Sequence, residues 1–140
     1  MTRSLTITVA LLAAATSASG QDIGPAANRL AQAWARADVN TLGGQAARTG
    51  LSLDVGGERV GPVSSRQASA ILKRVFDERE TMSASVGSAR EMHGENRRAF
   101  VELTWVTRSR GTSIPDSTTV LFSLELDGEQ WRITEIRLMR

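Results

Sequence analysis

Few residues in this chain are suited to catalysis. His93 is the single histidine, and there is no tyrosine and no cysteine. Acid–base catalysis near neutral pH would therefore depend on one imidazole, and thiolate nucleophiles, disulfides and cysteine-ligated metals are excluded. His93 precedes the turn signal Gly94 and shares the alternation of Ser83 and Ser85. We expect its side chain on the surface, away from the apolar interior.

Metal ligands are equally scarce. The densest acidic residues are Asp77-Glu78 and Glu80, which flank Arg79. A metal site needs three or more converging ligands, whereas this mixed charge pattern is typical of a solvated helix end. The glycines do not have the spacing of a phosphate-binding loop. We expect neither a metal ion nor a cofactor.

Four residues are candidates for a ligand pocket: Trp34, Phe76, Arg90 and Trp105. The three aromatic side chains would either line an apolar pocket or pack as plain core. Arg90 shares the alternation of Val86, which predicts that it points into the interior and anchors an anionic ligand. The alternative is an arginine that extends into solvent or pairs with a glutamate. The sequence leaves both choices open.

The charge distribution argues against nucleic acid as a partner. The chain carries 17 Lys and Arg against 15 Asp and Glu. Nucleic-acid binding requires a clustered basic face, and the arginines here are scattered. The densest places, Arg97-Arg98 and Arg108 with Arg110, both flank predicted turns.

The first 20 residues predict export. Arg3 precedes an apolar run over residues 5–15, and small residues follow as far as Gly20. This order is typical of a secretory signal peptide cleaved after Gly20 or Ala18. The run is shorter than the roughly 20 residues that span a bilayer. We therefore expect residues 1–20 to be a signal peptide, and residues 21–140 to form one domain in the periplasm or outside the cell, with no membrane span.

The N-terminal half predicts helices joined by a hairpin. Pro25 is suited to open a first helix, and Asp38 to cap a short second helix over residues 39–46. Residues 51–55 alternate as a strand, and residues 58–63 form the return strand of a hairpin. The hairpin turn is Gly56-Gly57, and Pro62 predicts that the return strand either lies at a sheet edge or ends there.

The third helix has the strongest signal. Ser64 and Gln67 form a capping box at the start of a helix over residues 64–80. Its apolar residues recur at helical spacing and define one buried face: Ala68, Ile71, Leu72, Val75 and Phe76. Arg79 falls on the opposite, solvent-facing side of this helix.

After this helix the period changes to two, which predicts four antiparallel strands with short connections. In the first strand we expect Met82, Ala84 and Val86 to face inward. In the last strand the apolar file shifts by one residue between Ile133 and Ile136, as a β-bulge would produce. The predicted fold class is α+β: three N-terminal helices with an inserted hairpin, packed on a curved, mostly antiparallel sheet.

Some apolar side chains have the opposite parity and belong to the outer face of this sheet. Phe100, Val106 and Leu121 lie there, accompanied by threonines and a serine. Such a face is consistent with a dimer interface or with an ordinary exposed sheet.

Three stretches have the order and separation found in one known superfamily. Residues 33–42 resemble the end of its first helix with an aspartate before the second, residues 64–72 the start of its third helix, and residues 128–138 its closing strand. The chain from residue 21 onward therefore resembles the nuclear transport factor 2-like superfamily of cone-shaped, cystatin-like α+β domains. The third-helix stretch is similar to small exported bacterial members of unknown function.

The resemblance implies a cone with an internal pocket, and often a dimer formed through the sheet. Some relatives, such as ketosteroid isomerases and polyketide cyclases, are enzymes with acidic, histidine or tyrosine groups inside the cone. This chain has no tyrosine to serve as an oxyanion donor, and fold alone does not decide between enzyme and binder.

We predict an exported, non-catalytic accessory or binding domain. It would take a small apolar or anionic ligand, form a homodimer through the sheet face, or do both. The alternatives are a small isomerase, dehydratase or cyclase that uses the cone pocket, and a purely structural interaction module with a filled cone. Two or more acidic or histidine side chains in one cavity would favour the enzyme.

Overall fold

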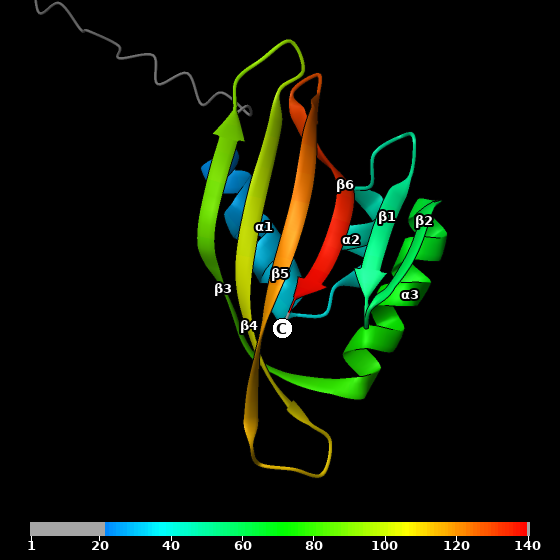
Figure 1. The fold of residues 1–140 in the computed structure, drawn as a ribbon, viewed down its shortest axis with the longest axis vertical. Helices are drawn as coiled ribbons and strands as arrows, with labels where there is room; N and C mark the ends of the chain where they lie inside the picture. Colours follow the sequence, from blue (N-terminus) through cyan, green and yellow to red (C-terminus); the bar gives the residue numbers. More distant parts are fainter. Residues whose placement is uncertain (1–21, 140) are drawn as a thin grey trace, which may run out of the picture.

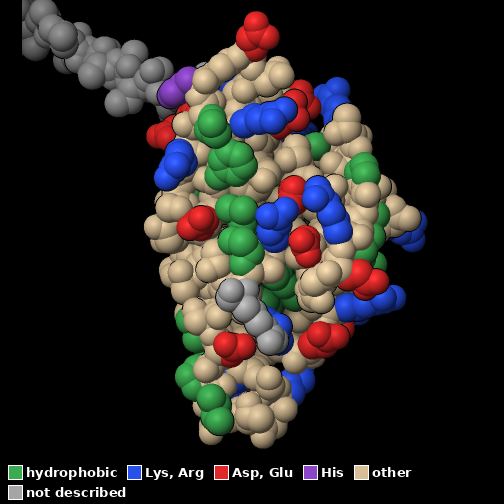
Figure 2. Space-filling model, in the orientation of Figure 1, with side chains coloured by type: hydrophobic (Ala, Val, Ile, Leu, Met, Phe, Trp, Pro, Cys, Tyr) green, Lys and Arg blue, Asp and Glu red, His purple; other side chains and the backbone are tan. Residues whose placement is uncertain are grey.

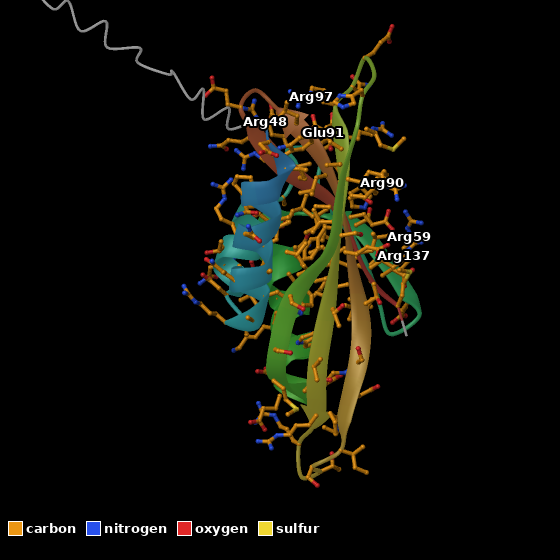
Figure 3. All side chains as sticks on the ribbon, turned by 90° about the vertical axis from the view of Figure 1, so that its left-hand side faces the viewer. Arg48, Arg59, Arg90, Glu91, Arg97 and Arg137 are labelled. Carbon is orange, nitrogen blue, oxygen red and sulfur yellow. The ribbon has the colours of Figure 1, made fainter. Side chains whose placement is uncertain are left out.

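A computed structural model of the chain describes residues 22–139, so the predicted signal peptide lies outside the described residues. The elements follow in the order α1 (Ile23–Ala35), α2 (Val39–Gly44), β1 (Leu51–Val55), β2 (Glu58–Val63), α3 (Ser65–Glu78), β3 (Arg79–Met92), β4 (Arg98–Ser109), β5 (Pro115–Asp127) and β6 (Gln130–Met139). The strands form a six-stranded sheet in the order β2-β1-β6-β5-β4-β3 (Figure 1). The helices cover one face of the sheet and leave the other open (Figure 3). The predicted α+β class is confirmed.

The sheet is antiparallel except for one pair of neighbouring strands, β1 and β6. β3, β4, β5 and β6 form the predicted meander, and the β1–β2 hairpin joins it because β1 pairs in parallel with β6, Leu53 opposite Ile136. Gly56 and Gly57 have φ of 68° and 81°, the positive values that the predicted tight hairpin turn requires. β2 forms one edge of the sheet, as Pro62 predicted.

The helix caps are local and mostly match the sequence signals. The Asp38 carboxylate accepts the Thr41 backbone N–H at 3.2 Å and starts α2, which ends at Gly44 rather than at residue 46. For α1 the cap is Asp22, whose Oδ1 accepts the Gly24 N–H at 3.1 Å. Pro25 therefore occupies the first turn and does not open the helix.

The predicted capping box of α3 is confirmed. Ser64 Oγ accepts the Gln67 N–H at 3.2 Å, and Gln67 Oε1 accepts the Ser64 N–H at 3.0 Å. The helix ends at Glu78, earlier than predicted, because Arg79 is already extended with φ −134° and ψ 141°. Arg79 therefore begins β3 and does not belong to the solvent-facing side of the helix.

Bulges in β3 overturn part of the predicted alternation. The pairing with β4 shifts between Thr81 and Ser83 and again between Val86 and Ser88. Met82 is the extra residue of the first shift and is 54% exposed, so the prediction that it faces inward was wrong. A bulge adds one residue to one strand and thereby exchanges the faces of the residues beyond it. In β6 the predicted bulge is confirmed, since the register moves from Ser123 opposite Glu135 to Leu124 opposite Ile133.

Four aromatic rings form the centre of the core. Trp34 lies edge-on to Phe76, Trp105 and Phe122, with centroid separations of 4.8, 5.3 and 5.7 Å. Edge-to-face pairs of this kind are worth about 0.5–1.5 kcal/mol each beyond the area that they bury. Leu72, on the predicted buried face of α3, is fully buried in the same hydrophobic core.

Candidate functional site

The predicted pocket aromatics come together, but in close contact with one another. Trp34 and Trp105 are fully buried and Phe76 is 7% exposed. Trp105 Nε1 donates a hydrogen bond to Thr81 Oγ1 at 3.0 Å, whereas Trp34 Nε1 is buried with no hydrogen-bond partner in the part of the chain that the structure describes. The hollows described below are lined by other residues.

The structure contradicts the predicted orientation of Arg90. Beyond the second β3 bulge, Ala89 and Glu91 lie opposite the buried residues Val101 and Ala99, and Arg90 lies opposite Phe100 on the outer face. Its side chain points away from the helices (Figure 3). The alternation failed as a guide here because it did not anticipate the extra residue.

His93 lies exposed just beyond the end of β3, as the sequence predicted. It is therefore remote from the start of the same strand, where the arginine described next is located.

Arg79 is the arginine that enters the interior. It shares the inner face with Thr81, which lies opposite buried Thr107. Arg79 Nη1 donates to Thr118 Oγ1 at 3.3 Å, and the guanidinium carbon lies 5.6 Å from the Trp105 ring centroid. The sequence did not predict this position of Arg79, because the helical pattern ends and the strand pattern begins at this residue.

No carboxylate within the described residues forms an ion pair with the half-buried Arg79. The adjacent Glu80 instead receives hydrogen bonds from Arg108 at 2.8 and 3.0 Å. The hydrogen bond from Arg108, followed by its charge, holds the pKa of the Glu80 carboxyl below its ordinary value. Glu80 is thus committed to a different cation, and Arg79 keeps its charge uncompensated.

Arg79 lines a hollow of about 370 Å³ between α3, the β1–β2 hairpin and the end of β6, which we call the α3 hollow. Its walls are apolar: Val55, Val60, Ile71, Val75 and Leu138. Glu58, Arg74 and Glu78 are its other charged lining residues, and all three are exposed. An apolar chamber with one sheltered cation is suited to bind an apolar molecule that carries a negative group.

The outer face of the sheet, which the helices leave open, carries several apolar side chains. Phe100, Val106 and Leu121 are half-buried there, as predicted. Figure 2 shows hydrophobic side chains in a column along this face, with charged side chains beside it.

An ionic network adjoins the column on β2, β1 and β6. Arg137 lies 3.1 Å from Glu135 and 3.7 Å from Asp54, and Arg59 lies 3.5 Å from Glu135. These pairs are partly exposed, so each contributes little stability by itself. The charges of these two arginines and two carboxylates nearly cancel on this side of the outer face.

Neither a cluster of metal ligands nor a membrane-spanning helix occurs within residues 22–139. The structure brings together no three metal-ligating side chains in that range. None of the helices in that part of the chain is long and apolar enough to cross a bilayer.

Comparison with known proteins identifies the fold. No family model and no curated protein matches the sequence. A DUF4783 family protein from Bacteroides ovatus matches the structure with a TM-score of 0.65 and 20% identity, over 79% of this chain and 91% of that one. A protein from Catenulispora acidiphila with a ketosteroid isomerase-like fold, in complex with trimethylamine, gives 0.62 and 20%, over 81% and 82%.

A third similar structure has a cystatin-like fold. It is a domain of unknown function from Nostoc punctiforme, with a TM-score of 0.61 and 14% identity over 82% of this chain and 73% of that one. The chain therefore has the nuclear transport factor 2-like, cystatin-like fold that its sequence resembles. At these identities the likeness concerns the fold and does not extend to activity.

Proposed function

We propose that this protein is an exported, non-catalytic binding domain that holds a small apolar carboxylate in the α3 hollow. The observation that carries the proposal is Arg79, a half-buried cation that pairs with no carboxylate among residues 22–139 and lines a partly apolar hollow. Partial burial of a charge costs free energy unless a counter-charge compensates it. A ligand carboxylate would supply that counter-charge through a charge-assisted hydrogen bond.

The surroundings of Arg79 support this role. Its contacts with Thr118 and Trp105 hold the guanidinium in one place, which lowers the entropic cost of binding. The similar protein from Catenulispora acidiphila was crystallised with trimethylamine, a small organic base. The fold is thus compatible with a small organic ligand, and Arg79 favours the opposite charge in this chain.

The enzyme alternative has less support from the same hollow. Glu58 and Glu78 both line it, but both are exposed and neither lies near the single histidine, His93. A general acid or base is normally adapted to its role by burial or by a coupled partner. An apolar wall and one fixed cation are sufficient for binding and insufficient for proton transfer.

Calorimetric titration with hexanoate and with hexanol tests the proposal, because the two probes share an apolar chain and differ in charge. We expect hexanoate to bind more tightly, and Arg79→Gln to weaken hexanoate by about tenfold or more while leaving hexanol unchanged. Arg74→Gln, an exposed arginine of the same hollow, is the matched control. Equal effects of the two substitutions, or no preference for hexanoate, would refute the proposal. Circular dichroism spectra of both variants show whether the fold is retained.

A second candidate function is self-association through the outer face. Phe100, Val106 and Leu121 present apolar surface there, and Arg90 and Glu102 on the same face form no ion pair within the described residues. A face that carries unpaired charges of both signs is complementary to a second copy of itself.

Sedimentation equilibrium measures this association directly. We expect a dimer that Leu121→Arg converts to monomer, whereas Ser65→Arg, at an exposed position on α3, leaves the dimer intact. A monomer at all concentrations excludes this function without affecting the ligand proposal.

A further inference from the structure

A second, larger hollow lies at the other end of the sheet. It has a volume of about 490 Å³ and is bordered by α1, the end of α2 and the turn between β5 and β6; we call it the end hollow. Strand β6 passes both hollows: Gln130 and Arg132 near its start line the end hollow, and Leu138 near its end lines the α3 hollow. The two hollows therefore share a strand but no lining residue.

The end hollow contains arginines from two separate elements. Arg29 projects from α1 and makes no ion pair or hydrogen bond with the described residues. Arg132 projects from β6, and its Nη1 donates to the Gly44 carbonyl oxygen at 3.1 Å. Its Nε is buried with no hydrogen-bond partner among residues 22–139. A buried N–H without an acceptor is uncommon in folded proteins, so the hydrogen-bonding capacity of Arg132 is not fully used.

The other lining groups suit a polar ligand. Gln45 and Gln130 add amide groups that donate and accept hydrogen bonds, and Glu129 is the only acidic side chain of the lining. Formally, the lining carries two positive charges against one negative charge. Its lining is more polar than that of the α3 hollow, half of whose lining residues are apolar.

Buried apolar side chains form the floor of the hollow. Leu30 and Leu124 are buried, and Trp131 is 6% exposed with the Arg97 guanidinium 5.8 Å from its ring centroid. Arg97 also pairs with Glu91, so this cation is already engaged. Arg29 and Arg132 remain as the cations that face the hollow with bonding capacity left.

We propose that the end hollow is a second ligand site, which binds a small polar dicarboxylate. The planar guanidinium group forms paired hydrogen bonds with a carboxylate. Two arginines on different elements can therefore each hold one end of a short diacid, and the glutamine amides bind the oxygens that remain. The volume of the hollow falls within the usual range for small-molecule sites.

Amide chemical-shift titration of the purified protein with succinate tests this site, with neutral succinamide as the matched probe. We expect saturable binding of succinate, with the largest shifts at residues 44–45 and 129–132. Binding of succinamide should be at least about tenfold weaker, because the charge-assisted hydrogen bonds are absent. Equal binding of the two probes overturns the proposal, as do shifts confined to the α3 hollow.

A substitution of Arg29 tests the end hollow most specifically. Arg29 is exposed on α1 and lines the end hollow, whereas Arg132 also lines a smaller hollow of about 130 Å³ beside Arg48 and Asp127. Arg29→Gln should weaken succinate by about tenfold, and Arg66→Gln, an exposed arginine on α3, should leave it unchanged. Equal affinities for the two variants would exclude the end hollow.

Glu129→Gln should change the affinity for succinate in the opposite direction. Removing the acidic side chain of the lining should tighten succinate binding by about two- to fivefold, because it removes a like-charge repulsion. Tighter binding supports the site, and unchanged or weaker binding counts against it.

A titration with inorganic phosphate completes the set of experiments. If phosphate binds at these residues and succinate does not, the dicarboxylate assignment is wrong. Hexanoate binding at Arg79 is measured separately, so either site can fail without the other.

Discussion

Two neighbouring glycines in α2 should respond in opposite ways to alanine. A Cβ atom added to Gly43 would lie 2.0 Å from Ser69 Oγ and 2.7 Å from the Ser65 carbonyl oxygen, both on α3. A Cβ added to Gly44 would meet nothing within 4 Å. The absence of a side chain at Gly43 thus permits the close contact of the two helices.

The expected magnitudes follow from this geometry. Inserting a methyl group into a packed contact costs about 1–3 kcal/mol, and the better helix propensity of alanine returns about 0.5–1 kcal/mol. Gly43→Ala should therefore lower the free energy of unfolding by about 1–2 kcal/mol, whereas Gly44→Ala should leave it unchanged or raise it by about 0.5 kcal/mol.

Ser69→Ala in the Gly43→Ala background should recover part of the loss. It removes the 2.0 Å contact, but the Ser65 carbonyl oxygen remains in place. It also deletes the hydrogen bond that Ser69 Oγ donates to the Val39 carbonyl oxygen at 2.9 Å. Recovery should therefore be incomplete.

Urea unfolding followed by far-UV circular dichroism measures these differences, with the slope m as a check that the variants unfold in the same way. The reasoning is refuted if Gly43→Ala and Gly44→Ala have free energies of unfolding within about 0.5 kcal/mol of each other, which is the usual range of neutral surface substitutions. That result would mean that α2 does not contact α3 at Gly43 as the structure describes.

Two further predictions concern the helix caps. Ser64→Ala should cost about 1 kcal/mol of unfolding free energy because it removes the α3 cap, whereas Ser65→Ala, one residue on, should be close to neutral in the same urea titration; similar losses would contradict the capping box. The hydrogen bond from the Thr41 side chain, followed by that from its backbone N–H, lowers the pKa of Asp38 below its ordinary 3.8. The ionised carboxylate therefore stabilises the fold fully above about pH 4, and this contribution is lost as the pH falls through the lowered folded value. The melting temperatures of wild type and Asp38→Asn should accordingly converge in acid, and a constant difference from neutral pH to about pH 2 would contradict this account.

The features that the sequence predicted correctly depend on neighbouring residues. Asp38 and Ser64 cap helices through backbone groups three residues away, so the signal is present in any short window. Gly56-Gly57 forms a tight turn because both residues adopt positive φ. The bulge in β6 was visible because the apolar residues on either side of it changed parity.

The bulges of β3 could not be recognised from the sequence in the same way. Met82 and Val86 continue a regular alternation in the sequence, and only the pairing with β4 reveals that the register shifts beside each of them. As a result Arg90, predicted to face inward, lies on the outer face, since a single added residue exchanges the two faces of a strand. Arg79, predicted on a wet helix surface, lines the α3 hollow for a different reason, because α3 ends at Glu78 and Arg79 already belongs to β3.

By itself, the chain's order of residues determined the α+β class, the helix caps, the hairpin and the aromatic positions of the core. These depend on side-chain period and on hydrogen bonds between near neighbours, which can be read along the chain. The tertiary structure alone decided which arginines face a hollow and which hollow they face. Arg29 and Arg132 are far apart in sequence, and they line one hollow because the fold places α1 and the start of β6 on its borders. Proximity of that kind arises only when the sheet closes against its helices.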